Sequence, residues 1–210
     1  YRGKNLLLYA DDAIVVVYKP AGLAVQTKKM GEKDLESLLR TWQAGQGAGT
    51  YIGVVHRLDQ PVEGVMVLAR TKEAAAALSA QAAGTDMQKT YVAVTRGVLP
   101  KVEGQLTDFL LRDGKTNTSR VVDRKTPGAK KASLDYRILS VQTTEAKQSL
   151  VEIHLHTGRH HQIRVQFAAR KHPLSGDGKY GSRVKRDIAL QSCGLQFRHP
   201  DTGKPLQFSL

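Results

Sequence analysis

Cysteine is nearly absent from this 210-residue sequence, which contains a single one, Cys193. One cysteine excludes an internal disulfide and any zinc site built from several cysteines, and it agrees with a reducing compartment. Long apolar runs are missing as well, since none approaches the roughly 20 residues that a membrane-spanning helix needs. The chain opens on the polar residues Tyr1-Arg2-Gly3-Lys4-Asn5, unlike a secretory signal. We therefore expect a cytoplasmic protein without a membrane segment.

Acidic residues are scarce relative to basic ones. The sequence contains 19 Asp and Glu against 32 Lys and Arg, which gives a formal net charge of +13. Such an excess favours an anionic partner, and nucleic acid is the first candidate. The basic residues spread through 112–131 and 159–186 and do not form one tail. A solvated basic surface is therefore the alternative interpretation.

Strand-like runs dominate the chain, with helical patterns between them and no internal repeat. One apolar helix face is predicted from the spacing of Leu35, Leu38, Leu39 and Trp42. Thr71 is a suitable N-cap for a second helix, which should end near Gly84. The clearest strands are predicted at Thr90–Thr95, Leu106–Leu111, Arg120–Val122, Ser133–Val141 and Ser149–Leu155. This order favours an α+β fold, one domain over residues 1–210 around a mixed, largely antiparallel sheet with flanking helices.

The stretch "GVVHRLDQPVEGVMVLAR", residues 53–70, places polar side chains between two apolar runs. A simple turn would be better served by Gly, Asn or Ser than by an Arg and an Asp. Arg57 and Asp59 share strand parity, so an extended chain would present both on one face. Asp59 could equally cap a turn. The pattern nevertheless indicates a polar site.

A second polar cluster, "HTGRHHQIR", covers residues 156–164. A helix starting at Thr157-Gly158 would place several donors for carboxylate or phosphate in its first two turns, namely Arg159, His160, His161 and Arg164. His154 and His156 alternate to one face of a strand, but the spacing of a metal site is missing, and we expect none.

The segment "QKTYVAVTRG" forms a third cluster, in which Lys89 and Tyr91 share parity on a predicted strand. One face could therefore carry an ammonium group and a phenol ring together. Packing of the ring across strands is the alternative.

Five motifs in this order resemble the RluA-like family of RNA pseudouridine synthases. They are "KPAGLAV" (Lys19–Val25), "HRLDQPVEGVMVLART" (His56–Thr71), "KTYVAV" (Lys89–Val94), "TGRHHQIRVQFA" (Thr157–Ala168) and "PLSGDGKYG" (Pro173–Gly181). The resemblance covers nearly the whole chain. It implies the pseudouridine synthase fold and the isomerisation of specific uridines in ribosomal or transfer RNA.

The resemblance also implies roles for single residues. Asp59 matches the nucleophile, Arg164 its ion-pair partner, and Tyr91 the tyrosine that stacks on the target base. Arg57 matches the arginine that enters the RNA stack as the uridine swings out. Further RNA contacts are expected from His56, Lys89, Arg159, His161 and Gln162. No cofactor and no metal are implied, the partner is structured RNA, and a monomer is the default.

The sequence departs from the family pattern in three places. Val62-Glu63-Gly64 follows where Thr-Ser-Gly is common, and the retained glycine predicts that the turn survives. His161 matches the motif histidine, which leaves His160 at a variable position. Many relatives carry an N-terminal domain of S4 type, and none is expected in this chain. Two alternatives stay open: a catalytically inactive RNA-binding protein on this fold, and a metal-dependent nuclease using His154, His156 and Asp177.

Overall fold

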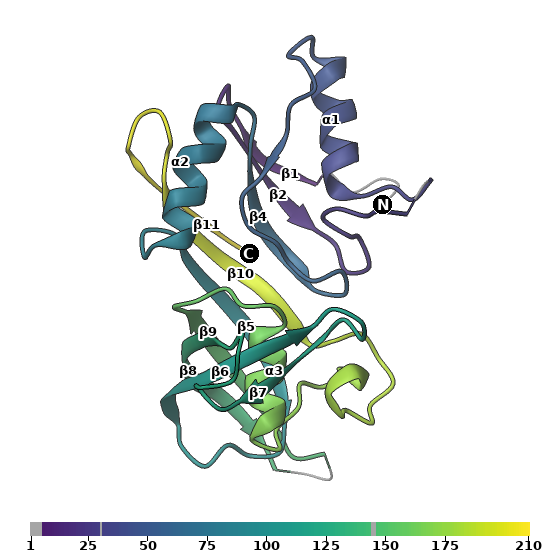
Figure 1. Ribbon diagram of the computed structural model, residues 1–210, viewed down its shortest axis with the longest axis vertical. Helices are drawn as coiled ribbons and strands as arrows, with labels where there is room; N and C mark the ends of the chain where they lie inside the picture. Colours follow the sequence, from purple (N-terminus) through teal and green to yellow (C-terminus); the bar gives the residue numbers. More distant parts are fainter. Residues whose placement is uncertain (1–5, 30, 144–145) are drawn as a thin grey trace. The chain divides into compact units, whose positions relative to one another are not determined.

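The computed structural model describes residues 6–29, 31–143 and 146–210 (Figure 1). The polar opening residues 1–5 lie outside this range. The chain divides into two compact units. The first comprises the chain up to Lys89 together with Ser192–Leu210, and the second comprises Thr90–Gln191. Two strands, β5 (Gln88–Arg96) and β10 (Leu190–Arg198), contain residues of both units.

The first unit is built on the strand order β1-β2-β4-β10. β3 pairs with β4, and β11 pairs with β10. The bounds of its elements are β1 (Leu7–Ala10), β2 (Ile14–Lys19), α1 (Leu35–Gly45), β3 (Gly53–Val54), β4 (Glu63–Ala69), α2 (Lys72–Ala83) and β11 (Pro205–Ser209). Residues 14–17 of β2 and 64–69 of β4 are buried without alternation, so both faces of these strands are covered. The β-branched, apolar sequence of both strands explains their place at the centre of this unit.

The two predicted helices of the first unit are confirmed. Asp34 caps α1 in a reciprocal capping box with Ser37. Thr71 caps α2 by accepting from the backbone N–H of Ala74, and Gly84 ends it. On α1 the third buried position is Gln43, while Trp42 is only half-buried.

The second unit has the strand order β5-β9-β8-β6-β7. Its other elements are β6 (Glu103–Asp113), β7 (Thr118–Val122), β8 (Lys130–Gln142), β9 (Gln148–Leu155), α3 (Gln162–Ala169) and the 3-10 helix η1 (Gly178–Tyr180). On β8 and β9 buried apolar residues alternate with polar ones, among them Leu134 and Ile153 at full burial. One sheet face is therefore apolar, and α3 buries Val165 and Phe167. The predicted strands are confirmed, with longer bounds than the apolar runs alone indicated.

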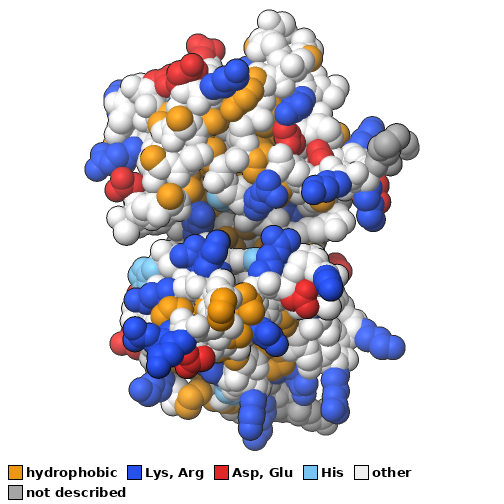
Figure 2. All heavy atoms as spheres, viewed as in Figure 1, with side chains coloured by type: hydrophobic (Ala, Val, Ile, Leu, Met, Phe, Trp, Pro, Cys, Tyr) orange, Lys and Arg blue, Asp and Glu red, His pale blue; other side chains and the backbone are white. Residues whose placement is uncertain are grey.

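The α+β class and the largely antiparallel pairing are thus confirmed. Figure 2 shows Lys and Arg side chains distributed over the visible surface of both units, with fewer Asp and Glu. In the described part of the chain no helix is long and apolar enough to cross a membrane.

Candidate active site

The segment between β3 and β4 carries Asp59 at a turn. Residues 55–62 are not part of a strand, and the backbone N–H of Val62 donates to the carbonyl of Asp59 at 3.0 Å. The parity argument for Arg57 and Asp59 was therefore wrong, because it requires an extended strand. Arg57 is exposed and its guanidinium donates to the side chain of Gln26, while Asp59 is half-buried. The turn places both outside the sheet.

Lys19, the last residue of β2, donates hydrogen bonds to this turn and to the neighbouring Pro20–Leu23 turn. Its side chain is fully buried, and Nζ donates to the carbonyls of Leu23 at 2.7 Å, Pro20 at 3.1 Å and Gln60 at 3.1 Å. Burial lowers the pKa of Lys19 to about 8, and the charges of Asp59 and Glu63 oppose that fall. The ammonium therefore ties the Pro20–Leu23 turn to the residue next to Asp59.

His56 lies inside the first unit, 8% exposed. Its Nε2 accepts from the backbone N–H of Val67 at 3.1 Å. Burial, with a smaller effect of the charge on Lys89, lowers the pKa of His56 to about 3, so the ring is neutral at pH 7. Burial also lowers the pKa of Lys89. The observed bond gives His56 a part in holding the turn against β4, and an RNA contact from His56 or Lys89 stays a prediction.

The Val62-Glu63-Gly64 departure fits the local structure. Glu63 accepts from the hydroxyl of Tyr18 at 2.6 Å. Gly64 has φ +135°, and a Cβ there would lie 2.2 Å from the carbonyl oxygen of Ser192. Only glycine fits at this position, since the strained backbone and the close approach both exclude a side chain.

In the second unit Arg164 is buried on α3 and has a carboxylate partner. Nε lies 2.7 Å from Asp177 Oδ2, and Nη2 lies 2.8 Å from Oδ1. The side chains of the two residues are 6% and 1% exposed. The guanidinium also lies 5.1 Å from the centroid of the Tyr180 ring. This two-point pairing fixes the plane of the guanidinium.

Helix α3 begins at Gln162, later than the predicted start at Thr157-Gly158. The reason lies in the Gln162 side chain, whose Oε1 accepts from Thr157 Oγ1 at 2.7 Å and from the Arg159 backbone N–H at 3.0 Å. These bonds stabilise a bend before the helix, and His161 enters it with a left-handed backbone, φ 54°. Arg159 and His160 therefore precede the helix.

The remaining predicted RNA contacts differ in exposure. Arg159 is exposed and donates from Nε to the carbonyl of Lys131 at 2.8 Å. Gln162 is 3% exposed and His161 is 7% exposed. His161 Nδ1 lies 2.6 Å from the Tyr180 hydroxyl, and burial, followed by the charge of Arg164, lowers the pKa of His161 to about 3. The structure thus gives Gln162 and His161 internal partners, and their contacts with RNA stay predictions.

Tyr91 lies on β5 and is 6% exposed. It is followed at spacings of two by the buried Ala93 and Thr95, so it belongs to the strand's buried face. The predicted shared parity with Lys89 holds, because β5 is continuous over both positions.

Comparison with known proteins identifies the family. Residues 13–169 match the family described as RNA pseudouridylate synthase. The chain belongs to this family. It is 34% identical to the Bacillus subtilis protein named as the uncharacterized RNA pseudouridine synthase YhcT, over 95% of this chain and 66% of the relative. It is 30% identical to tRNA pseudouridine synthase C of Yersinia pestis, over 95% of this chain and 83% of the relative.

Other relatives carry different names. Ribosomal large subunit pseudouridine synthase D of Xanthomonas campestris is 34% identical, over 97% of this chain and 64% of the relative. The chain thus spans about two thirds of the length of the Bacillus and Xanthomonas pseudouridine synthases. The structure titled Human RNA Pseudouridylate Synthase Domain Containing 4 has a TM-score of 0.78 at 24% identity, covering 97% of this chain and 87% of the other. This likeness shows that the fold is that of an RNA pseudouridylate synthase domain.

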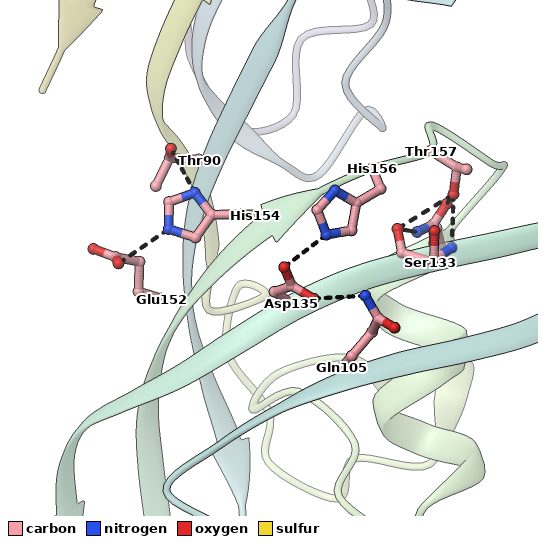
Figure 3. Close-up of polar contacts among 9 residues, drawn as sticks. Thr90, Gln105, Ser133, Asp135, Glu152, His154, His156 and Thr157 are labelled. Carbon is pink, nitrogen blue, oxygen red and sulfur yellow. Dashed lines mark hydrogen bonds and ion pairs between the residues drawn. The ribbon is translucent and has the colours of Figure 1, made fainter. Parts of the chain in front are cut away.

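The two histidines weighed as metal ligands lie on the polar face of the second unit (Figure 3). His154 contacts Glu152 at 3.1 Å and Thr90 at 3.3 Å, and His156 contacts Asp135 at 2.7 Å. Within the described ranges no group of three His, Cys, Asp or Glu side chains is arranged to hold a metal ion.

Two residues of the site were missed as partners of Arg164. Asp177 was considered only as a metal ligand, and Tyr180 only as part of a motif. The loop that carries them is fixed by Gly176, which has φ +83° and whose Cβ would lie 2.2 Å from the carbonyl oxygen of Asp187. The sequence "SGDGKYG" was the available signal, because closely spaced glycines indicate a tight backbone.

Proposed function

We propose that this family member is an RNA pseudouridine synthase that isomerises specific uridines. One observation carries the proposal: residues 13–169 match the family, and this range contains Asp59, Tyr91 and Arg164, the three residues to which we assign the chemistry. The Lys19 contacts beneath the Asp59 turn and the Asp177 contacts to Arg164 support it, since both functional side chains stand on fixed supports.

The reaction conserves every atom of the uridine except for one exchanged proton. The bond from ribose C1′ to N1 breaks, the uracil turns, and C1′ bonds to C5. The proton on C5 leaves to solvent, and N1 regains one. No electron is gained or lost, so no redox cofactor is needed. Asp59 acts as the ionised carboxylate in this scheme, by attack on C1′, by attack on the base, or by assisting glycal formation.

Arg164 supplies the positive charge that favours the ionised form of Asp59. Tyr91 stacks on the flipped uracil, an interaction of about 1–3 kcal/mol, and assists the loss of the C5 proton. Arg57 fills the space that the base leaves, which offsets an unstacking cost of a few kcal/mol. Its exposure on the turn beside Asp59 supports that role.

The substrate is structured RNA, ribosomal or transfer, docked through basic surface in the cytoplasm. The net charge of +13 supports an RNA partner. Relatives named for transfer RNA and for the large ribosomal subunit match the chain at 30% and 34% identity. Neither class is favoured by this difference.

The test is release of tritium from RNA labelled at uracil C5. Bulk transfer RNA and ribosomal RNA from a strain lacking this protein are incubated with wild type, Asp59→Asn and Asp12→Asn. Asp12 is exposed on the turn before β2 and serves as a matched control. We expect release by wild type and Asp12→Asn from one RNA pool, and none by Asp59→Asn.

Full release by Asp59→Asn would overturn the assignment of the nucleophile. No release from either pool, while RNA binding is retained, would favour the inactive RNA-binding alternative. Cleavage of the RNA strands that is abolished by a chelator would favour the metal-dependent nuclease.

A further inference from the structure

The β6–β7 hairpin and the bend before α3 are joined by side chains that the proposed chemistry does not use. The rings of His160 and His161 stack with their centroids 3.7 Å apart. His160 Nδ1 lies 2.8 Å from Ser119 Oγ, and its Nε2 lies 3.2 Å from Asn117 Oδ1. An amide oxygen only accepts, so Nε2 donates to Asn117, and in the neutral ring Nδ1 then accepts from the Ser119 hydroxyl. His160 therefore contacts the hairpin at two points.

Tyr180 connects the same hairpin to Arg164. Its hydroxyl accepts from the backbone N–H of Ser119 at 2.9 Å and lies 2.6 Å from His161 Nδ1. Its ring lies 5.1 Å below the Arg164 guanidinium. Lys179, one residue before it, donates to the carbonyl of Asn117 at 3.3 Å. The hairpin and Arg164 are thus attached to one phenol group.

The backbone at both sides of this junction is in an unusual conformation. Asn117 has φ 50° and His161 has φ 54°. They are two of the three non-glycine residues with positive φ in the described ranges. Left-handed backbone at a non-glycine residue persists where surrounding contacts fix it. The contacts at this junction therefore stabilise two backbone conformations that non-glycine residues rarely adopt.

Basic side chains of the β6–β7 hairpin line a cavity. Arg112, Lys115 and Arg120 are exposed and line a cavity of about 530 Å³. Arg112 donates to the side chain of Asn117 at 3.3 Å. Hydrogen bonding to the Lys115 backbone lowers the pKa of Asp113, and the charge of Arg120 contributes to this lowering. The one acid of the lining, Asp113, accepts from the backbone N–H groups of Lys115 and Thr116. The cavity thus has the charge that suits RNA phosphates.

We propose that His160 is a positioning residue, which fixes the β6–β7 hairpin against the helix carrying Arg164 so that Arg112, Lys115 and Arg120 receive RNA phosphates in register with the site. The inference rests on the proposed function for its RNA partner. The contacts of His160 with Ser119 and Asn117 carry the inference.

The test is RNA binding by wild type, His160→Ala, a triple variant Arg112→Ala/Lys115→Ala/Arg120→Ala, and the combination of all four changes. We expect His160→Ala to weaken binding about fivefold to tenfold and to make the salt dependence shallower by about 0.7–0.9 for each phosphate lost. In the triple variant, the same change should have no further effect. In assays of pseudouridine formation, the KM of His160→Ala for RNA should be higher than that of wild type, while its kcat stays near the wild-type value.

Two further variants separate positioning from general damage. His160→Gln keeps a donor for Asn117 and should recover part of the affinity, and His160→Phe keeps the stacking but not the bonds. His154→Ala removes a histidine from the opposite, polar face of the same unit and should bind as wild type (Figure 3). If His160→Ala fails to fold by thermal unfolding, His160→Phe replaces it in the comparison.

The proposal would be overturned if His160→Ala reduced RNA affinity equally in wild type and in the triple variant. It would also be overturned if His160→Ala bound RNA as wild type does. Binding requires no turnover. A protein that forms no pseudouridine but shows this pattern would refute the proposed function and leave the positioning role intact.

Discussion

Lys19 gives the sharpest test of how the Asp59 turn is supported. Lys19→Met keeps the length of the side chain and removes its charge and its donors. Three hydrogen bonds from a charged group contribute about 1.5–3 kcal/mol each, or roughly 5–9 kcal/mol together. Against this, moving the pKa of Lys19 from 10.5 to about 8 corresponds to about 3 kcal/mol of burial penalty. The variant should therefore lose about 2–6 kcal/mol of unfolding free energy at pH 7.

The pH dependence tests the same reasoning independently. Between pH 8 and 10.5 the unfolded chain holds the Lys19 proton and the folded chain does not. Raising the pH in this window therefore favours the folded state, by about 1.4 kcal/mol per pH unit. Below pH 8 both states are protonated and the burial penalty is fully present. The free energy of wild type minus that of Lys19→Met should accordingly rise above pH 8.

The assay is urea unfolding of both proteins at pH 7, 8, 9 and 10. Taking the difference between them cancels the titration of all other groups. Lys28→Met, at an exposed position, is the control and should show neither effect. A difference that stays constant from pH 7 to pH 10 would refute the claim that folding disfavours the Lys19 ammonium.

Two other predictions concern buried polar groups. Asp177→Asn should lower the free energy of unfolding by about 3–5 kcal/mol and abolish most of the tritium release, because it leaves the Arg164 charge without this carboxylate. Asp187→Asn, at an exposed position, is the control and should change neither quantity. Equal behaviour of the two variants would contradict the role of the Arg164–Asp177 pair. His56, with a pKa of about 3 when folded and 6.5 when unfolded, contributes stability that is complete above pH 6.5 and is lost on acidification, by about 2 kcal/mol between pH 6.5 and 5. Urea unfolding of wild type and His56→Gln across this range should show their difference shrinking toward low pH, and a constant difference would count against a buried, neutral ring.

Local signals in the sequence were sufficient for the second helix but not for the third. Thr71 and Gly84 fixed the helix between them, because capping acts within one turn. The start of α3 was predicted too early, since the bend before it is held by Gln162, whose side chain reaches back to Thr157 and Arg159. A glutamine gives no indication of such bonds until the tertiary structure is known.

The candidate site shows the same division. Asp59 and Arg164 were predicted as site residues from their motifs, but the side chains that contact them or their turns were not predicted as such. Lys19 binds three backbone carbonyls, and carbonyls are present at every residue, so the sequence offers no pattern to read. The pairing of Arg164 with Asp177 spans 13 residues and depends on a loop whose shape is set by Gly176. Partners of this kind are determined by the fold.

The two-point contact between Arg164 and Asp177 has a consequence for the entropy of RNA binding. A free arginine side chain loses about 2 kcal/mol of rotamer freedom when it is immobilised. Here that ordering accompanies folding, because Nε and Nη2 are already held by the carboxylate. In the proposed reaction, the guanidinium does not have to be ordered again when RNA binds, and the binding energy that would have gone into ordering it is available for turning the uridine out of its stack.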